Sequence, residues 1–231
     1  MNYTLQNRGY FDVLKMVADD FNQEGVNYAL VGGTGIQSRI SDISCRAQKT
    51  TIPGTNNLEH VLRPTNDLDI TSDADEEFFT GFFNRIQALN HPNVVVLDER
   101  PRSKKIVMSI KGKKDPIGVF VNYQTGPQDF SGLDTGFYSD CLETATDLIL
   151  PYRGSKAQIR VATPECLVAS KLTRSDPKDI FDISTLLRTM KTYRQFGGRL
   201  DENVVKAHLE RAGKGYMVGR LAEIKAQITK E

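Results

Sequence analysis

The most informative stretch of the sequence is Arg63-Pro64-Thr65-Asn66-Asp67-Leu68-Asp69-Ile70. Its two aspartates alternate with apolar residues, which predicts a β-strand with both carboxylates on one face and Leu68 and Ile70 on the other. Alternate residues of a strand lie about 7 Å apart, so the two carboxylates can converge on one divalent cation. Because Mg²⁺ is usually held by one or two carboxylates together with substrate phosphates, the pair indicates nucleotide chemistry.

A glycine pair upstream supplies the complementary half of such a site. Residues 26–31 form a short apolar run that predicts a buried strand, and Gly32-Gly33 ends it. Thr34 then has the side chain of a helix N-cap, so a helix is expected through about residue 40. Glycines between a strand and a helix let backbone N–H groups approach a phosphate closely. One stretch is therefore predicted to bind phosphates, and the other to bind the metal that bridges them.

Composition places the chain among ordinary globular proteins. Its 231 residues suffice for one large domain or two small ones, and 39% of them are apolar and 26% charged. The formal charge of +1 excludes a strong whole-protein field for nucleic acid, although it leaves a local basic patch open.

A cytoplasmic location is expected from the cysteines and the hydropathy. Cys45, Cys141 and Cys166 are odd in number and irregular in spacing, which is typical of a reducing compartment without a disulfide or zinc framework. No apolar run approaches the roughly 18 residues of a membrane span, and the polar residues 1–8 lack the apolar core of a signal peptide. No membrane association is therefore predicted.

Hydrophobic periodicity predicts an α/β (α+β) fold, with a mixed β-sheet domain over residues 1–162 and a C-terminal helical domain over 163–231. The boundary rests on Thr163-Pro164-Glu165, which combines a helix N-cap, a first-turn proline and a favourable acid. Residues 41–57 are polar and aperiodic, and are predicted to form a loop or small insertion; residues 126–138 are also expected to be loop. Helices are expected over 9–24, 73–89, 177–190, 201–211 and 216–229, besides the one that starts at 164, and further strands over 94–97, 105–111, 117–123, 146–150 and 158–161.

The motifs resemble a known superfamily. Gly-Gly-Thr at residues 32–34, followed by Arg-x-Thr-x-Asp-x-Asp at 63–69, is similar to the DNA polymerase beta-type nucleotidyltransferase superfamily. Within it, the pattern is most similar to the AbiEii-type toxin branch of abortive-infection and type IV toxin–antitoxin systems. Lys-Leu-Thr-Arg at 171–174 and Lys-Asp-Ile-Phe-Asp at 178–182 also resemble that branch, in which a lysine-containing helix precedes an Asp-x-x-Asp helix.

The resemblance implies a nucleotidyltransferase-like fold that transfers a nucleotide from an NTP to a hydroxyl of RNA or protein. Asp67 and Asp69 are implied to hold Mg²⁺. Lys171 is implied as a catalytic residue that points into the cleft between the two domains and contacts a substrate phosphate. A cognate antitoxin protein is implied as a partner. The residues implied to bind the nucleotide are Gly32, Gly33, Thr34, Arg63 and Thr65.

The sequence departs from the family pattern in its third carboxylate. A later strand should carry it, but the strand predicted at 117–123 has Phe120 and Asn122 at the aligned positions. Neither an apolar ring nor an amide can act as a base at neutral pH. Two hypotheses stay open: a loop carboxylate reaches the site, or the site binds NTP and turns over slowly or not at all. The candidate loop residues are Asp115, Asp129 and Asp134.

Other function classes also stay open. The missing carboxylate favours a catalytically degenerate nucleotide-binding or interaction module. Residues 171–182 argue against a small-molecule nucleotidyltransferase of the kind that modifies antibiotics. A dinucleotide-binding fingerprint is weak because Ser38 stands where the third glycine belongs, and the sequence has no Gly-Lys-Ser/Thr of a P-loop.

Plain structural roles are the alternative for several of these side chains. Without the resemblance, Lys171 would be a surface lysine, Asp179 would complement the helix dipole, and Asp182 would pair with Lys178 at i, i+4. No cysteine has an evident base, so no constellation for nucleophilic catalysis is expected. The histidines, which are predicted at the surface or in turns, are His60, His91 and His208.

Overall fold

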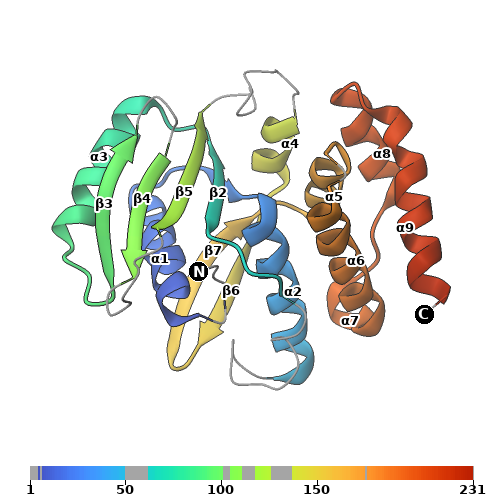
Figure 1. Cartoon of the computed structure of the whole chain (residues 1–231), viewed down its shortest axis with the longest axis horizontal. Helices are drawn as coiled ribbons and strands as arrows, with labels where there is room; N and C mark the ends of the chain where they lie inside the picture. The colour runs from blue at the N-terminus through green and yellow to red at the C-terminus, as the bar shows by residue number, and fades with distance from the viewer. Residues whose placement is uncertain are drawn as a thin grey trace.

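The computed structural model describes residues 5, 7–49, 62–100, 105–110, 118–125, 137–174 and 176–230. These residues contain one mixed sheet of seven strands (Figure 1). In spatial order the strands are β3 (Val94–Arg100), β4 (Lys105–Ile110), β5 (Gly118–Thr125), β2 (Asp67–Ser72), β1 (Tyr28–Leu30), β7 (Ser155–Val161) and β6 (Thr146–Tyr152).

The strand that carries the aspartate pair, β2, lies in the middle of this sheet. It pairs in parallel with β5 on one side and antiparallel with β1 on the other. β4 pairs antiparallel with both β3 and β5, and β6 and β7 form a further antiparallel pair that turns at Arg153 and Gly154. A central strand is the most constrained position for a binding residue, because both neighbours fix its backbone.

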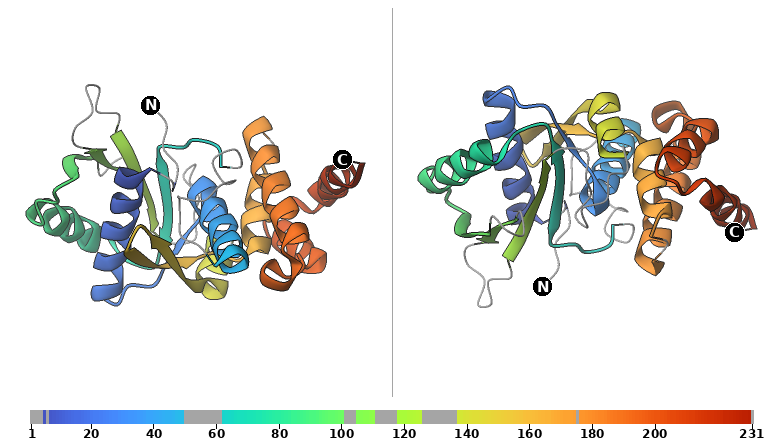
Figure 2. Two further views of the ribbon diagram at one scale, coloured as in Figure 1. Left: turned by 90° about the horizontal axis from the view of Figure 1, so that it is seen from below. Right: turned by 90° about the horizontal axis from the view of Figure 1, so that it is seen from above.

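Helices cover the sheet and continue beyond it. In chain order they are α1 (Arg8–Gln23), α2 (Gly32–Gln48), α3 (Glu76–Ala88), α4 (Phe137–Thr144), α5 (Pro164–Leu172), α6 (Pro177–Thr192), α7 (Arg194–Gly197), α8 (Glu202–Arg211), the 3₁₀ helix η3 (Gly215–Met217) and α9 (Val218–Lys230). α1 and α3 lie on one side of the sheet, and α2 packs between its other side and α5 and α6 (Figure 2). The predicted α/β (α+β) class, a mixed sheet followed by helices, is confirmed. None of the described helices is long and apolar enough to cross a membrane.

The helix after the glycine pair differs from its prediction at both ends. It begins at Gly32, with Val31 as its N-cap, because the Thr34 hydroxyl bonds to the β2 backbone instead of capping the helix. It ends at Gln48, so the loop predicted at 41–57 is wrong for residues 41–48. That polar segment is stabilised by C-terminal helices: Arg46 donates to the Phe196 carbonyl at 2.9 Å, and Gln48 to the Tyr193 hydroxyl at 3.1 Å. Residues 50–57 of the predicted insertion lie outside the described residues.

Two shorter corrections concern helix starts. The helix predicted over 73–89 begins at Glu76, and its N-cap is Asp75, whose carboxylate accepts from the Phe78 amide at 2.8 Å. The end of the loop predicted at 126–138 is the start of α4. The N-cap predicted at Thr163 is confirmed, since its hydroxyl accepts from the Cys166 amide at 3.4 Å.

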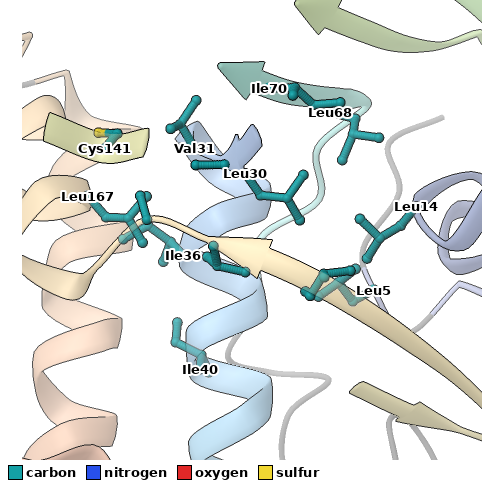
Figure 3. Close-up of a cluster of buried hydrophobic side chains, with 14 of the residues drawn as sticks. Leu5, Leu14, Leu30, Val31, Ile36, Ile40, Leu68, Ile70, Cys141 and Leu167 are labelled. Carbon is teal, nitrogen blue, oxygen red and sulfur yellow. The ribbon is translucent and has the colours of Figure 1, made fainter. Parts of the chain in front are cut away.

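One hydrophobic cluster joins the sheet to the helices after residue 163. Figure 3 shows Leu30 of β1, Leu68 of β2 and Ile36 of α2 packed towards Leu167 of α5 and Cys141 of α4. All five side chains are no more than 1% exposed. The C-terminal helices α5 and α6 therefore pack against α2, which in turn packs on β2, and the division at residue 162 into two domains stays a prediction.

Candidate functional site

The two aspartates of β2 lie on its partly exposed face. Leu68 and Ile70 are fully buried, whereas Asp67 and Asp69 are half-buried, which is the alternation that the sequence predicts for this strand. The strand therefore leaves both carboxylates within reach of solvent and of a ligand.

The start of α2 lies directly against this face. The Val31 amide donates to the Asp69 carbonyl at 3.0 Å, which fixes the end of β1 beside β2. Gly32 follows with φ +61°, and a Cβ at that position would lie 2.1 Å from Asp69 Oδ2. Only glycine allows both this backbone conformation and this approach.

The first amides of α2 form an electropositive end beside the carboxylates. The Gly35 amide makes the first helical hydrogen bond, to the Val31 carbonyl at 2.9 Å, so the amides of residues 32–34 precede the helical ladder. Such amides and the helix dipole favour an anion. Around Gly33, a Cβ would lie 3.0 Å from Arg63 Nη2 and 3.9 Å from Thr65 Oγ1. The glycine pair, Arg63, Thr65 and Asp69 therefore come together, although they span two separate parts of the chain.

Two buried hydroxyls hold the backbone of β2 at the first aspartate. Tyr10 Oη donates to the Asp67 carbonyl at 2.6 Å, Thr34 Oγ1 donates to the same oxygen at 2.8 Å, and the two hydroxyls contact each other. Burial raises the pKa of Tyr10 well above its ordinary value, against the opposing effect of Thr34, so the phenol stays protonated. Tyr10 was not predicted here, because its spacing assigns it only to the apolar side of α1.

An ion network lies behind Arg63. Its Nε and Nη2 donate to the two carboxylate oxygens of Asp182, both at 2.8 Å. Lys171 Nζ lies between the two acids of α6, 2.7 Å from Asp179 Oδ1 and 2.7 Å from Asp182 Oδ2. Burial lowers the pKa of Arg63, but the hydrogen bond and charge of Asp182 outweigh it, and the pKa is raised. The bidentate contact fixes the plane of the guanidinium beside Gly33.

The predicted position of Lys171 needs correction. The side chain is 1% exposed and its ammonium contacts two carboxylates, so it does not point into an open cleft. A buried ammonium needs such partners, and the Asp-x-x-Asp spacing of α6 supplies them on one helix face. The default pairing of Asp182 with Lys178 is also replaced, because Asp182 contacts Lys171 and Arg63 instead.

The parallel register aligns β5 with the aspartate pair. Phe120 is the register partner of Asp67, and Asn122 that of Asp69. These are the two positions at which the family pattern expects a third carboxylate. The loop alternatives Asp115, Asp129 and Asp134 lie outside the described residues.

The carboxylates of Asp67 and Asp69 could supply part of the ligand set of a Mg²⁺ ion, but not all of it. Across the described ranges, no group of three or more His, Cys, Asp or Glu side chains is arranged to hold a metal. Asp67 and Asp69 are a pair, and Mg²⁺ sites of this kind are completed by substrate phosphates and water. The neighbouring anion-favouring amides of α2 are where such phosphates would lie.

One group of functional side chains was missed by sequence reasoning. His208 was expected at the surface or in a turn, but it is 6% exposed and contacts Cys166 and Asp140. Cys166 therefore does have a base. The sequence did place Cys166 in the first turn of a helix, where a thiol is readily ionised. It could not show that His208 of α8 and Asp140 of α4 lie next to this cysteine, because no local pattern connects the three segments.

No protein-family model and no curated protein matches the chain. Solved structures do resemble it. An antigenic nucleotidyltransferase-like protein from Paracoccidioides brasiliensis is 16% identical over 77% of this chain and 74% of its own, with a TM-score of 0.43. The antibiotic-resistance factor ANT(2'')-Ia is 11% identical over 96% and 98%, with a TM-score of 0.45. JHP933 from Helicobacter pylori is 11% identical over 95% and 92%, with a TM-score of 0.46. Because each TM-score is below 0.5, the proposal below rests on the geometry of the site and not on these likenesses.

Proposed function

We propose that the protein is a nucleotidyltransferase-like protein of the AbiEii toxin type, which binds NTP with Mg²⁺ and transfers a nucleotide to a hydroxyl of RNA or protein. The observation that carries the proposal is the contact between Gly32 and Asp69. It joins an anion-favouring helix start to a half-buried carboxylate pair, which supports a phosphate subsite beside a metal subsite. A cognate antitoxin and a cytoplasmic location belong to the same proposal.

In this proposal the start of α2 binds the negative phosphates of an NTP–Mg²⁺ complex, and the aspartates of β2 bind its positive metal ion. Asp67 and Asp69 would hold Mg²⁺, which when bound would supply neutralisation of phosphate charge. The amides of residues 32–34 receive phosphate oxygens, and the Thr65 hydroxyl lies at the same place, near Gly33. The hydroxyls of Tyr10 and Thr34 keep the Asp67 backbone in position. The chain's work is positioning and charge stabilisation.

Lys171 contributes to this site through Arg63. Its ammonium holds Asp182, Asp182 holds the guanidinium of Arg63, and the guanidinium lies over Gly33. Lys171 is then a positioning residue, and Arg63 is the cation that a phosphate would meet. Lys171 would therefore serve the site that its motif implies, but through Asp182 and Arg63 and without touching the substrate.

The test is a transfer assay with each labelled NTP, Mg²⁺ and a mixture of total cellular RNA and protein. Label on RNA or on protein supports the proposal, and loss of that label with Asp69→Ala assigns it to this site. An aminoglycoside added as a further acceptor separates the small-molecule class, because label would then move to the antibiotic. Absence of Mg²⁺-dependent NTP binding would contradict the proposal altogether.

A second candidate is a nucleotide-binding module without turnover. The observation that favours it is the register of β5, which aligns Phe120 and Asn122 with the aspartates where a base is expected. General-base catalysis contributes about 10²–10⁴-fold, so its loss would slow transfer without removing binding. Mg²⁺-dependent NTP binding with no label on any acceptor would favour this candidate.

A further inference from the structure

A second cluster of reactive side chains lies outside the nucleotide site, where α4, α5 and α8 meet. Cys166 Sγ of α5 lies 3.3 Å from His208 Nε2 of α8, and His208 Nδ1 lies 2.7 Å from Asp140 Oδ2 of α4. Arg211 of α8 pairs with the other oxygen of Asp140. The thiol of Cys141, also in α4, donates to the Cys166 sulfur. The cluster contains a nucleophile, a base, an acid that orients the base, and a second thiol.

The backbone around Cys166 also favours a thiolate. Thr163 caps α5 and Pro164 is its first residue, so Cys166 lies in the first turn of the helix. The amides and the dipole at a helix N-terminus stabilise a negative charge there. The helix start and the neighbouring imidazole act in the same direction.

The charge state of the cluster follows from these contacts. The hydrogen bond from Cys141 lowers the pKa of Cys166 most; burial opposes it, and bonds from His208, Thr144 and Thr163 add to the lowering, which brings the pKa to about 4. The Cys166 contact raises the pKa of His208 to about 9, against burial and with the help of Asp140. At neutral pH the pair is therefore thiolate and imidazolium. Burial raises the pKa of Cys141, which stays a thiol.

The position of the sulfur limits which reagents reach it. Cys166 and Cys141 are both fully buried. Thr144 is exposed, and its hydroxyl lies 3.4 Å from Cys166 Sγ, so the buried sulfur contacts a residue of the surface. Because the sulfur itself is buried, the reagent expected to reach it is a small oxidant and not a bulky electrophile or an extended peptide.

We propose that Cys166 is a thiolate that reduces hydroperoxides, and that Cys141 resolves the product into a disulfide between α5 and α4. The proposal is independent of nucleotide transfer, because none of these residues contributes to the site on β2.

The Cys166 sulfur attacks the terminal oxygen of the hydroperoxide, the O–O bond breaks, and the leaving oxygen takes the proton of the His208 imidazolium as water or alcohol. The sulfur is now a sulfenic acid and the peroxide has been reduced. The Cys141 sulfur then attacks Cys166, the S–S bond forms, and the S–O bond breaks. The departing oxygen leaves as water with the Cys141 proton, which neutral His208 can transfer. Two thiols and one hydroperoxide give one disulfide, one water, and one further water or alcohol.

Cys45 of α2 is an internal control. Burial, with a smaller contribution from Asp42, raises its pKa to about 11, so it is protonated at neutral pH. At pH 7 ionisation alone favours Cys166 by about four powers of ten, and the lower nucleophilicity of a low-pKa thiolate offsets about three of them. Cys166 is therefore expected to react about tenfold faster than Cys45.

The experiment treats the full chain with one equivalent of hydrogen peroxide at pH 7, alkylates it after denaturation and maps the peptides by mass. The expected result is a Cys141–Cys166 disulfide with Cys45 still reduced. Cys141→Ser should leave a sulfenic acid that dimedone traps on Cys166, and Cys166→Ser should abolish the disulfide. Oxidation of Cys45 as fast as Cys166, or a Cys166 that stays reduced, would overturn the proposal.

A second variant tests the activation. His208→Gln keeps a polar side chain but cannot hold the imidazolium charge, and should slow Cys166 oxidation about tenfold, while Cys45 reacts as before. An unchanged rate at Cys166 would overturn the role of His208. If this variant unfolds, the comparison of Cys166 with Cys45 within the unaltered chain still decides the main proposal.

Discussion

The protein holds two pairs of aspartates that differ in what surrounds them. Asp67 and Asp69 alternate along β2, and Asp179 and Asp182 lie one turn apart on α6, so each pair shares one face of its element. The β2 pair is half-buried and faces the amides at the start of α2. The α6 pair is 0% and 4% exposed and is bound by Lys171 and Arg63.

The difference shows that the surrounding cations, and not the carboxylates themselves, decide what each pair does. A buried carboxylate is tolerated only when a cation and hydrogen bonds compensate for its lost hydration, so the α6 pair has a structural role. The β2 pair keeps access to solvent, and so can accept an added cation. Arg63 links the two pairs, because the charges of both Asp182 and Asp69 act on it.

The largest effect is expected from removing the cation of the buried pair. Lys171→Met should lower the free energy of unfolding by about 3–5 kcal/mol, because it leaves two buried carboxylates without their shared ammonium. Urea denaturation measures this, and Lys178→Met, an exposed lysine on the same helix α6, is the matched control with little expected change. A loss below about 1 kcal/mol would mean that Lys171 is not the structural cation of the α6 pair.

The opposite result is expected at the half-buried β2 pair. Asp67→Ala and Asp69→Ala should each weaken Mg²⁺-dependent NTP binding by at least about tenfold, with stability within about 0.5 kcal/mol of the unaltered chain. Isothermal titration with and without Mg²⁺ measures the first, and urea denaturation the second. Asp73→Ala, an exposed aspartate just after β2, should change neither. NTP affinity that survives both substitutions would remove the metal assignment.

A smaller effect separates the conformation of Gly32 from its closeness to Asp69. Gly32→Ala forces a side chain into the left-handed region and against Asp69 Oδ2. Gly25 has φ +68° with open space around it, so Gly25→Ala carries only the conformational cost of about 1 kcal/mol. Gly32→Ala should lose more stability than Gly25→Ala, and should also weaken NTP binding. Equal losses in the two variants, with NTP affinity retained, would make the glycine only a turn.

The sequence predicted the β2 pair better than the buried one for a physical reason. Alternation along a strand and a glycine pair before a helix are local patterns, and the backbone alone places Asp67, Asp69 and Gly32. The environment of Lys171 depends on Arg63, which is distant in the sequence and reaches Asp182 only through tertiary packing. A lysine's burial is set by such partners, so local spacing assigned it to the surface or to a cleft.

The same reason explains the error at the end of α2. Residues 41–45 are buried although three of them are polar, and the exposed side chains of Arg46 and Gln48 bond to Phe196 and Tyr193. Polarity predicted a loop, whereas packing against the C-terminal helices stabilises a helix. Tyr10 was missed likewise, since its hydroxyl finds the Asp67 carbonyl only once β2 is in place.

The smallest change in stability is expected when the β2 pair is made more acidic. Asn122 of β5 is the register partner of Asp69 in a parallel pair, and residues in register share a face of the sheet. Asn122→Asp therefore tests whether a third carboxylate at this register position joins the pair, with no change in side-chain size. Without a cation the added repulsion should cost about 0.5–1 kcal/mol of stability. A divalent cation that binds the folded state should restore this lost stability. The stabilisation by Mg²⁺ should therefore be about 1 kcal/mol larger for Asn122→Asp than for the unaltered chain.

Urea denaturation with and without Mg²⁺ measures the loss of stability and the stabilisation by Mg²⁺. The control is Asn122→Ser, which adds no charge and should respond to Mg²⁺ as the unaltered chain does. An equal Mg²⁺ response in Asn122→Asp would mean that a carboxylate on β5 does not join the β2 pair, and that a base for nucleotide transfer must come from elsewhere in the chain.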